Sequence, residues 1–228
     1  VDGRYTIQAN IQCGKDYRIC TIPKKYPFNI LDNKNIKLGF DPKLHTENSL
    51  KRLFGNSFSK LKPINKNLID LLWKRKKKLD IKPFYLIKDQ DAGATLENKL
   101  SKLVELIKIN KVDYLFTTAS ENIAWLLNIR GHDTDYSPLP NAHAFINKKK
   151  EIVLFCNLKK INKDFKSRLN KKVKIYNFDH LQSFISNLLN KKILTDVISC
   201  SCFYKTIIKK NNSVIEKEDP IYLLKSLK

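Results

Sequence analysis

Polar side chains of unlike chemistry gather in the stretch NIRGHDTDYSPLP, residues 128–140. Arg130 carries a permanent positive charge, His132 titrates near neutral pH, and Asp133 is an anion. Few residues here favour a helix or a strand, and two prolines follow, so the stretch is predicted to be a loop. Loops carry much of the binding chemistry of proteins, so these three side chains are candidate substrate-binding residues.

Each candidate also has a structural interpretation. Arg130 and Asp133 stand three residues apart on a bend, so they can pair with each other or hold neighbouring backbone carbonyls. We favour this bracing role over contact with a ligand. His132 is expected to face solvent, and Gly131 to supply a backbone angle forbidden to other residues. Trp125, on the apolar stretch before the loop, is expected in the core, with a subunit contact as the alternative.

Alternating strand and helix patterns surround this loop and predict an α/β fold. Thr46 and Thr95 each precede a helical pattern, and the second pattern places leucines inward and Lys and Glu on the other face. Strands separated by helices imply mixed sheets with helices on both faces. The other predicted elements are helices at 5–12, 122–127 and 162–169 and from 179, and strands at 17–22, 36–40, 112–118, 143–147, 151–156 and 173–178.

Two domains are expected, residues 1–80 and 81–218, with 219–228 as the start of a linker. Their connector, between about 74 and 92, combines a lysine run with a proline and is expected to be exposed to proteases. The chain contains no Met and does not begin like a signal peptide, so we expect it to be an internal piece of a longer protein.

Composition limits the partners and the compartment. The formal net charge of +22 comes from lysines spread along the whole chain, without interleaved aromatic residues, so no specific nucleic-acid partner is expected. No apolar run approaches the roughly 18 residues of a membrane span, so no membrane partner is expected. Five cysteines without framework spacing suit reduced thiols, which favours a cytoplasmic location.

One long stretch also carries a resemblance. ENIAWLLNIRGHDTDYSPLPNAHAF, residues 121–145, resembles the signature of the middle domain of aminopeptidase P, the Xaa-Pro aminopeptidase branch of the creatinase and prolidase superfamily. Residues 123–131, Asp133 and Pro138 match that signature, whereas His132 stands where Ser or Gly is usual. Further stretches resemble the family's other elements in the same order: DGRY at 2–5, GFDP at 39–42, NLIDLLW at 67–73, AGATLENKL at 92–100 and DPIYLLK at 219–225.

The resemblance implies two creatinase-N-like domains, the first incomplete, that precede a C-terminal pita-bread catalytic domain. In the family, two Asp, one His and two Glu of that domain hold two divalent metal ions, manganese or zinc. Those motifs do not occur before Lys228, so no catalytic residue and no metal ligand is assigned to this chain.

The family's reaction is release of an N-terminal residue that precedes proline. This chain would then shape the cleft and the subunit contacts of a homodimer that acts on short peptides with proline at the second position. The alternative is a metal-free, peptidase-like module that binds peptides or proteins, because some relatives keep the architecture and lose the metals. The sequence that follows Lys228 separates the two functions: five metal ligands would favour the enzyme and substituted ligands the binding module.

Overall fold

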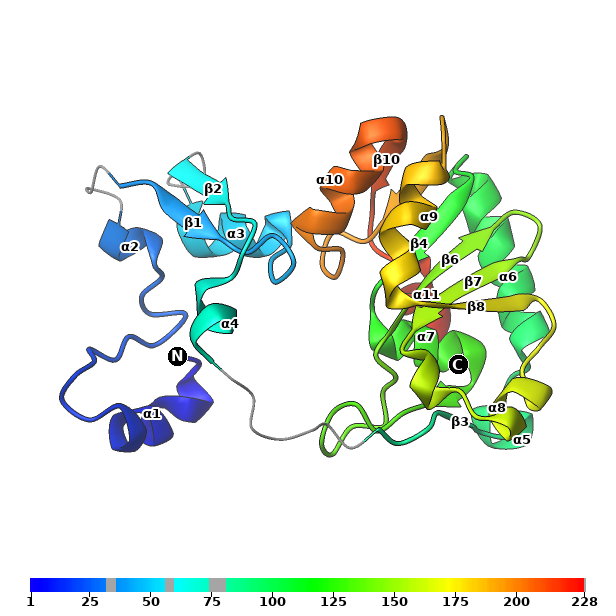
Figure 1. Cartoon of the computed structure of the whole chain (residues 1–228), viewed down its shortest axis with the longest axis horizontal. Coiled ribbons are helices and arrows are strands. Elements are labelled where there is room, and N and C mark those ends of the chain that lie inside the picture. The colour runs from blue at the N-terminus through cyan, green and yellow to red at the C-terminus, as the bar shows by residue number, and fades with distance from the viewer. Residues whose placement is uncertain (32–35, 56–59, 74–80, 228) are drawn as a thin grey trace. The chain divides into compact units, whose positions relative to one another are not determined.

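The computed structural model describes residues 1–31, 36–55, 60–73 and 81–227. The chain forms two compact units, Val1–Trp73 and Lys74–Lys228, and each is described by itself (Figure 1). Part of the expected connector, residues 74–80, lies outside the described residues. Its later part is not a connector, because Phe84 is fully buried and the strand and helix that follow it belong to the second unit.

The first unit contains a small parallel sheet of two strands, β1 (Leu38–Phe40) and β2 (Leu61–Pro63). The helix predicted to follow Thr46 is confirmed as α3 (Glu47–Phe54), because Thr46 and Ser49 cap each other's backbone N–H groups. The strand predicted at 17–22 is wrong: only Ile22 forms a bridge, to Asp2. The unit's other helices are η1 (Gly3–Tyr5), α1 (Thr6–Cys13), α2 (Phe28–Leu31) and α4 (Leu68–Leu72).

The second unit is built on a six-stranded mixed sheet with the order β10-β9-β4-β6-β7-β8. Its central strand β4 runs parallel to β9 and antiparallel to β6, and the predicted hairpin of β6 and β7 is confirmed. The strands are β4 (Tyr114–Thr117), β6 (Ala142–Asn147), β7 (Ile152–Cys156), β8 (Val173–Asn177), β9 (Lys192–Thr195) and β10 (Ser213–Glu216). A separate pair, β3 (Tyr85–Leu86) and β5 (Ile129–Arg130), is antiparallel.

Helices cover both faces of this sheet, as predicted for an α/β fold (Figure 1). Neighbouring strand residues such as Leu154 and Phe155 point to opposite faces and enter two separate hydrophobic cores. The first core is closed by α6 (Leu96–Ile109), α7 (Ser120–Leu127) and α11 (Pro220–Ser226), and the second by α9 (Leu181–Asn187) and α10 (Cys202–Asn211). The shorter helices are α5 (Asp89–Ala92), η3 (Leu158–Lys160), α8 (Lys163–Arg168) and η4 (Phe178–His180).

Helix α11 contributes to the first core, although residues 219–228 were expected to begin a linker. Ile221 is completely buried, and Leu224 packs against the same core. Asp219 caps the helix by accepting a hydrogen bond from the Ile221 N–H at 2.9 Å. The second unit is therefore described through residue 227 as one compact body.

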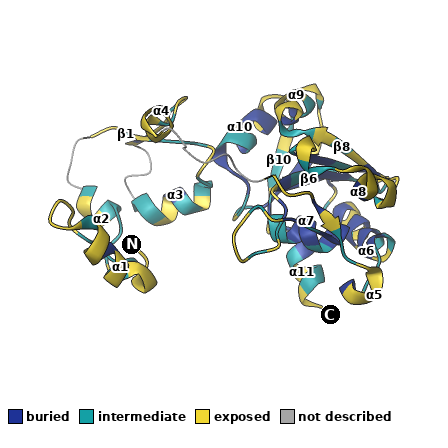
Figure 2. Cartoon of the chain, turned by 60° about the horizontal axis from the view of Figure 1, so that its bottom comes forward, coloured by how far each residue is buried: buried dark blue, intermediate teal, exposed yellow. Residues whose placement is uncertain are grey.

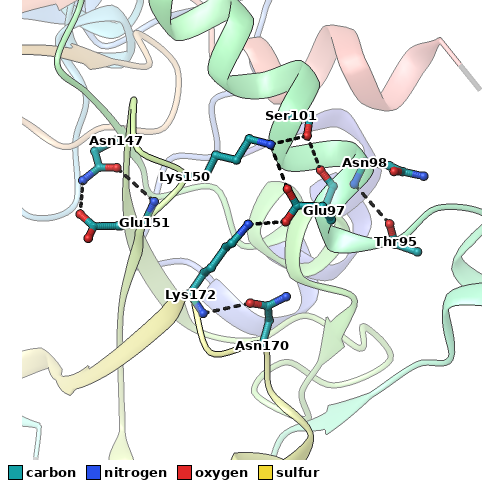
Figure 3. Close-up of polar contacts among 9 residues, drawn as sticks. All are labelled: Thr95, Glu97, Asn98, Ser101, Asn147, Lys150, Glu151, Asn170 and Lys172. Atoms are coloured by element: carbon teal, nitrogen blue, oxygen red, sulfur yellow. Dashed lines mark hydrogen bonds and ion pairs between the residues drawn. The ribbon is translucent and has the colours of Figure 1, made fainter.

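The start of α6 is tied to the sheet by a polar cluster around Glu97 (Figure 3). Its carboxylate accepts hydrogen bonds from Lys172, which precedes β8, at 2.6 Å and from Lys150, in the β6–β7 turn, at 2.9 Å. These bonds lower the pKa of Glu97 to about 2. The cluster joins three parts of the unit that are distant in sequence.

His143, on β6, is enclosed by aromatic rings on the side of the sheet that faces α10. The ring centroids of Phe178, Tyr204 and Phe116 lie 5.2, 5.3 and 6.1 Å from that of the imidazole. Burial lowers the pKa of His143 to about 4, although a hydrogen bond to the Ala142 carbonyl favours the charged form. The imidazole is therefore neutral in the folded protein at neutral pH.

This burial predicts acid sensitivity. Below about pH 6.5 the unfolded chain binds a proton at His143 that the folded chain accepts only near pH 4, so stability falls as the pH falls through that interval. The loss should approach about 2 to 3 kcal/mol by pH 4. In urea titrations between pH 7.5 and 4, we expect the unfolding free energy of a His143→Gln variant to depend less on pH than that of the wild type. The control His180→Gln, at an exposed position, should keep the wild-type pH dependence. Parallel pH profiles for the wild type and His143→Gln would contradict this assignment.

Candidate functional site

The candidate loop begins at Asn128, where α7 ends. Asn128 has a left-handed backbone (φ 53°) and is almost fully buried. Its side-chain amide donates to the Asp89 carboxylate at 2.8 Å and to the Ala94 carbonyl at 3.0 Å, and its oxygen accepts a hydrogen bond from Lys99. Asparagine is one of the few residues that adopt this conformation readily, so it can turn the chain from α7 into β5.

Lys99 completes the support of this turn from α6. The prediction that the lysines of α6 lie on the exposed face is wrong for Lys99, which is only 3% exposed. Its ammonium donates to the Trp125 carbonyl at 2.7 Å and lies 4.7 Å from the centre of the Trp125 ring. The interactions satisfy a carbonyl in the last turn of α7, and Trp125 packs against the first core, as predicted.

Arg130 uses its guanidinium on the backbone of its own segment. One nitrogen donates to the Ala124 carbonyl at 3.0 Å and to the Ile129 carbonyl at 2.8 Å. The first of these bonds ties β5 back to α7, and Arg130 is also paired with Tyr85 in the small antiparallel sheet. The side chain thus holds neighbouring carbonyls, one of the two bracing arrangements expected from the sequence.

Asp133 pairs with a lysine that sequence reasoning did not find. Its carboxylate forms an ion pair with Lys160 of η3, and both side chains are largely buried, at 9% and 14% exposed. The same carboxylate accepts a hydrogen bond from the Asn141 N–H at 2.7 Å, which closes the loop across its base. The pairing of Arg130 with Asp133, the other arrangement expected, is replaced by these separate contacts. Lys160 lies 27 residues beyond Asp133, which is why local spacing gave no signal.

Glycine is required at position 131 because there is no room for a side chain, and not because the backbone angle is unusual. Positive φ values occur among the described glycines at Gly14, Gly55 and Gly93, so the predicted role of Gly131 is wrong. A Cβ atom at Gly131 would lie 2.9 Å from the Pro140 Cα and 3.1 Å from both the Leu139 carbonyl oxygen and the Phe84 ring. The two sides of the loop base therefore approach each other more closely than any side chain allows.

The outer part of the loop encloses a polar hollow. Thr134 and Ser137 form an antiparallel bridge. Between them, Tyr136 has a left-handed backbone (φ 60°) and a fully exposed side chain. The hollow has a volume of about 610 Å³, and its lining residues are Lys82, His132, Asp133, Thr134, Asp135, Tyr136, Ser137 and Pro138. His132 is exposed, as expected, and its ring centroid lies 5.4 Å from that of Tyr85.

The three predicted site residues thus divide into two kinds. Arg130 and Asp133 contact the protein itself, and His132 presents its imidazole ring to solvent at the hollow. Within the described ranges, no three His, Cys, Asp or Glu side chains gather as metal ligands would. No described helix is both long and apolar enough to cross a membrane.

Comparison with known proteins identifies the family of this chain. Residues 75–228 match the family model described as the creatinase/prolidase N-terminal domain. The chain belongs to this family. This creatinase/prolidase N-terminal chain is 29% identical to a probable Xaa-Pro aminopeptidase P of Coprinopsis cinerea over 85% of its length, and 29% identical to the Xaa-Pro aminopeptidase app-1 of Caenorhabditis elegans over 84%. It spans 33% of the length of each of these relatives.

A solved structure agrees with the sequence relatives. The X-prolyl aminopeptidase from Caenorhabditis elegans, described as a cytosolic enzyme with a di-nuclear active site, is similar with a TM-score of 0.83 and 26% identity. The likeness covers 96% of this creatinase/prolidase N-terminal chain and 38% of that protein. The resemblance inferred from the sequence is confirmed at the level of the family and the fold.

The close approach at Gly131 predicts that any side chain there destabilises the second unit. Gly131→Ala should lower the free energy of unfolding by about 1 to 3 kcal/mol, because the methyl group meets backbone atoms that cannot move independently. The measurement is urea denaturation followed by Trp125 fluorescence in a Trp73→Phe background, which leaves one tryptophan. The control Thr134→Ala, at an exposed position of the same loop, should stay within about 0.5 kcal/mol of the parent. A Gly131→Ala midpoint equal to this control would contradict the steric assignment.

The contacts of Arg130 predict a structural cost as well. Arg130→Ala removes hydrogen bonds from a charged donor to two carbonyls, which should cost about 1.5 to 3 kcal/mol in the same assay. Arg168→Ala is the matched control, because Arg168 pairs with Asp164 on the exposed surface of α8 and should contribute less than about 0.5 kcal/mol. Equal stability of the two variants would show that Arg130 does not brace the loop.

Proposed function

We propose that this chain forms the two N-terminal domains, divided near residue 80, of a metal-dependent Xaa-Pro aminopeptidase. The observation that carries the proposal is the structural similarity to the X-prolyl aminopeptidase of Caenorhabditis elegans over 96% of the chain. The complete protein would release an N-terminal residue that precedes proline, act on short peptides, form a homodimer and lie in the cytoplasm. The cytoplasmic location is supported by the description of that relative as a cytosolic enzyme.

In this proposal the catalytic metals belong to another part of the protein. The described residues offer no group of metal-ligating side chains, so they do not fit a pair of metal ions. Two divalent ions, manganese or zinc, are assigned to a pita-bread catalytic domain that follows residue 228 in the longer protein. The creatinase/prolidase N-terminal unit would supply a wall of the active-site cleft.

The loop at 130–140 is the part of this unit that we assign to the cleft. Its hollow is lined largely by polar side chains, which suit the N–H and C=O groups of a peptide, and its volume suits a few residues. His132 is the side chain best placed to contact the peptide, because its ring is exposed while Arg130 and Asp133 are engaged by the backbone and by Lys160. Arg130 and Asp133 would then act by fixing the position of His132.

Kinetics of two forms of the protein test the proposal. The 228-residue chain should hydrolyse no Xaa-Pro peptide with added manganese, whereas a longer protein that includes the following domain should do so. In the longer protein, His132→Ala should lower kcat/KM by roughly tenfold to a hundredfold with an unchanged melting midpoint. His180→Ala is the control, since His180 is also exposed and also lies against a tyrosine, Tyr176.

Three results would contradict these assignments. Hydrolysis that copurifies with the 228-residue chain would show that the active site does not need a further domain. An inactive longer protein would overturn the proposed function itself. Equal kcat/KM for His132→Ala and His180→Ala would remove His132 from the substrate site and leave the family membership untouched.

A further inference from the structure

Helix α7 connects the candidate loop at one of its ends with α11 at the other. Its last residue, Leu127, leads directly into the turn at Asn128 and the candidate loop. Its first turn lies against α11, the last helix of the described chain. Between these ends the helix is firmly packed, because Ile123, Ala124 and Leu126 are buried. Figure 2 shows α7 among the buried parts of this unit.

Two side-chain hydrogen bonds join the first turn of α7 to α11. The Tyr222 hydroxyl donates to the Glu121 carboxylate at 2.8 Å, and the Lys225 ammonium donates to the side-chain amide oxygen of Asn122 at 3.0 Å. Tyr222 and Lys225 are three residues apart, so they lie on the same side of α11, and the Lys225 ammonium lies 4.8 Å from the centre of the Tyr222 ring. Burial and the bond to Glu121 both raise the pKa of Tyr222, so the hydroxyl keeps its proton at neutral pH.

These hydrogen bonds restrict the orientation of α11, which apolar contacts already hold on the core. The completely buried Ile221 holds α11 on the core, but hydrophobic contact is non-directional and permits small rotations of a seven-residue helix. A hydrogen bond restricts both distance and angle, and two of them at successive turns fix the rotation of α11 about its axis. Asp219, buried at the helix start, limits translation by capping Ile221 and by donating its own N–H to the Asp196 carboxylate.

We infer that Tyr222 and Lys225 are positioning residues, which make α7 a common rigid support for the 130–140 loop and for the direction in which the chain leaves residue 227. This inference rests on the proposed function, since the direction matters only if a catalytic domain follows α11. The loop at one end of α7 and the catalytic domain at the other would then face each other in a fixed geometry. Neither Tyr222 nor Lys225 needs to touch the substrate for this role.

Hydrogen exchange on the 228-residue chain tests whether the hydrogen bonds of Tyr222 and Lys225 hold α11 in position. Tyr222→Phe and Lys225→Met each remove one hydrogen bond and keep most of the side-chain volume. Amide exchange within residues 220–226 should accelerate about fivefold for each lost bond, and about 25-fold in the double variant, because local opening becomes easier. Exchange within residues 128–133 should stay at the wild-type rate, since the far end of α7 is held by Asn128 and Lys99.

The control is Ser226→Ala, in the same helix, whose hydroxyl donates to the Leu223 carbonyl within α11 at 2.8 Å. Exchange in residues 220–226 of the double variant equal to that of Ser226→Ala would overturn the inference. Equal acceleration in 220–226 and 128–133 would also overturn it, because the two bonds would then contribute to general stability and not to the position of α11.

Kinetics of the longer protein test whether the position of α11 affects substrate binding. The double variant should raise KM about fivefold for an Xaa-Pro peptide and change kcat less than about twofold, because it disturbs the cleft wall and not the reacting groups. Unchanged KM in an active protein would overturn the positioning role while the proposed function stands. If the wild-type longer protein is inactive, the proposed function fails, and the exchange experiment alone decides whether the two bonds hold α11.

Discussion

The buried amide of Asn128 is the constraint on which the candidate site depends. Its left-handed backbone ends α7 and starts β5, and its side chain is bonded to Asp89, Ala94 and Lys99. The Asn128 carbonyl also accepts a hydrogen bond from the Ile87 N–H at 3.0 Å, which starts the pairing of β3 with β5. Four backbone or side-chain groups, all from residues 87–99, thus converge on one residue. Removal of any one partner would leave a polar group buried without compensation.

The fold was predictable where burial follows a regular period. The inward leucines of α6, the hairpin of β6 and β7, and the capping of α3 by Thr46 all depend on residues within a few positions of one another. The strand predicted at 17–22 failed because alternation of polar and apolar residues does not provide a partner strand, and only Ile22 finds a bridge. Pattern therefore identified the elements of the second unit better than those of the first.

The candidate loop could be singled out from the sequence, but its contacts could not. The density of Arg130, His132 and Asp133 marked the loop, yet the partner of Asp133 is Lys160, which only the packing of η3 beside the loop brings near. Gly131 shows the same limit, because its role depends on Pro140 and Phe84 and not on its own torsion angle. The helical pattern predicts that Lys99 lies on the surface. It is buried instead, because its ammonium contacts the carbonyl and the indole ring of Trp125.

The polar cluster around Glu97 has a consequence for the order of folding. Its two ion pairs close loops of 53 and 75 residues, so each requires the β6–β7 hairpin or the crossover into β8 to have docked beforehand. Contacts across such sequence separations form late, because the entropy of loop closure must be overcome before they contribute. Glu97 should then stabilise the native state more than the transition state. We therefore expect the cluster to slow unfolding and to have little influence on how fast the chain folds.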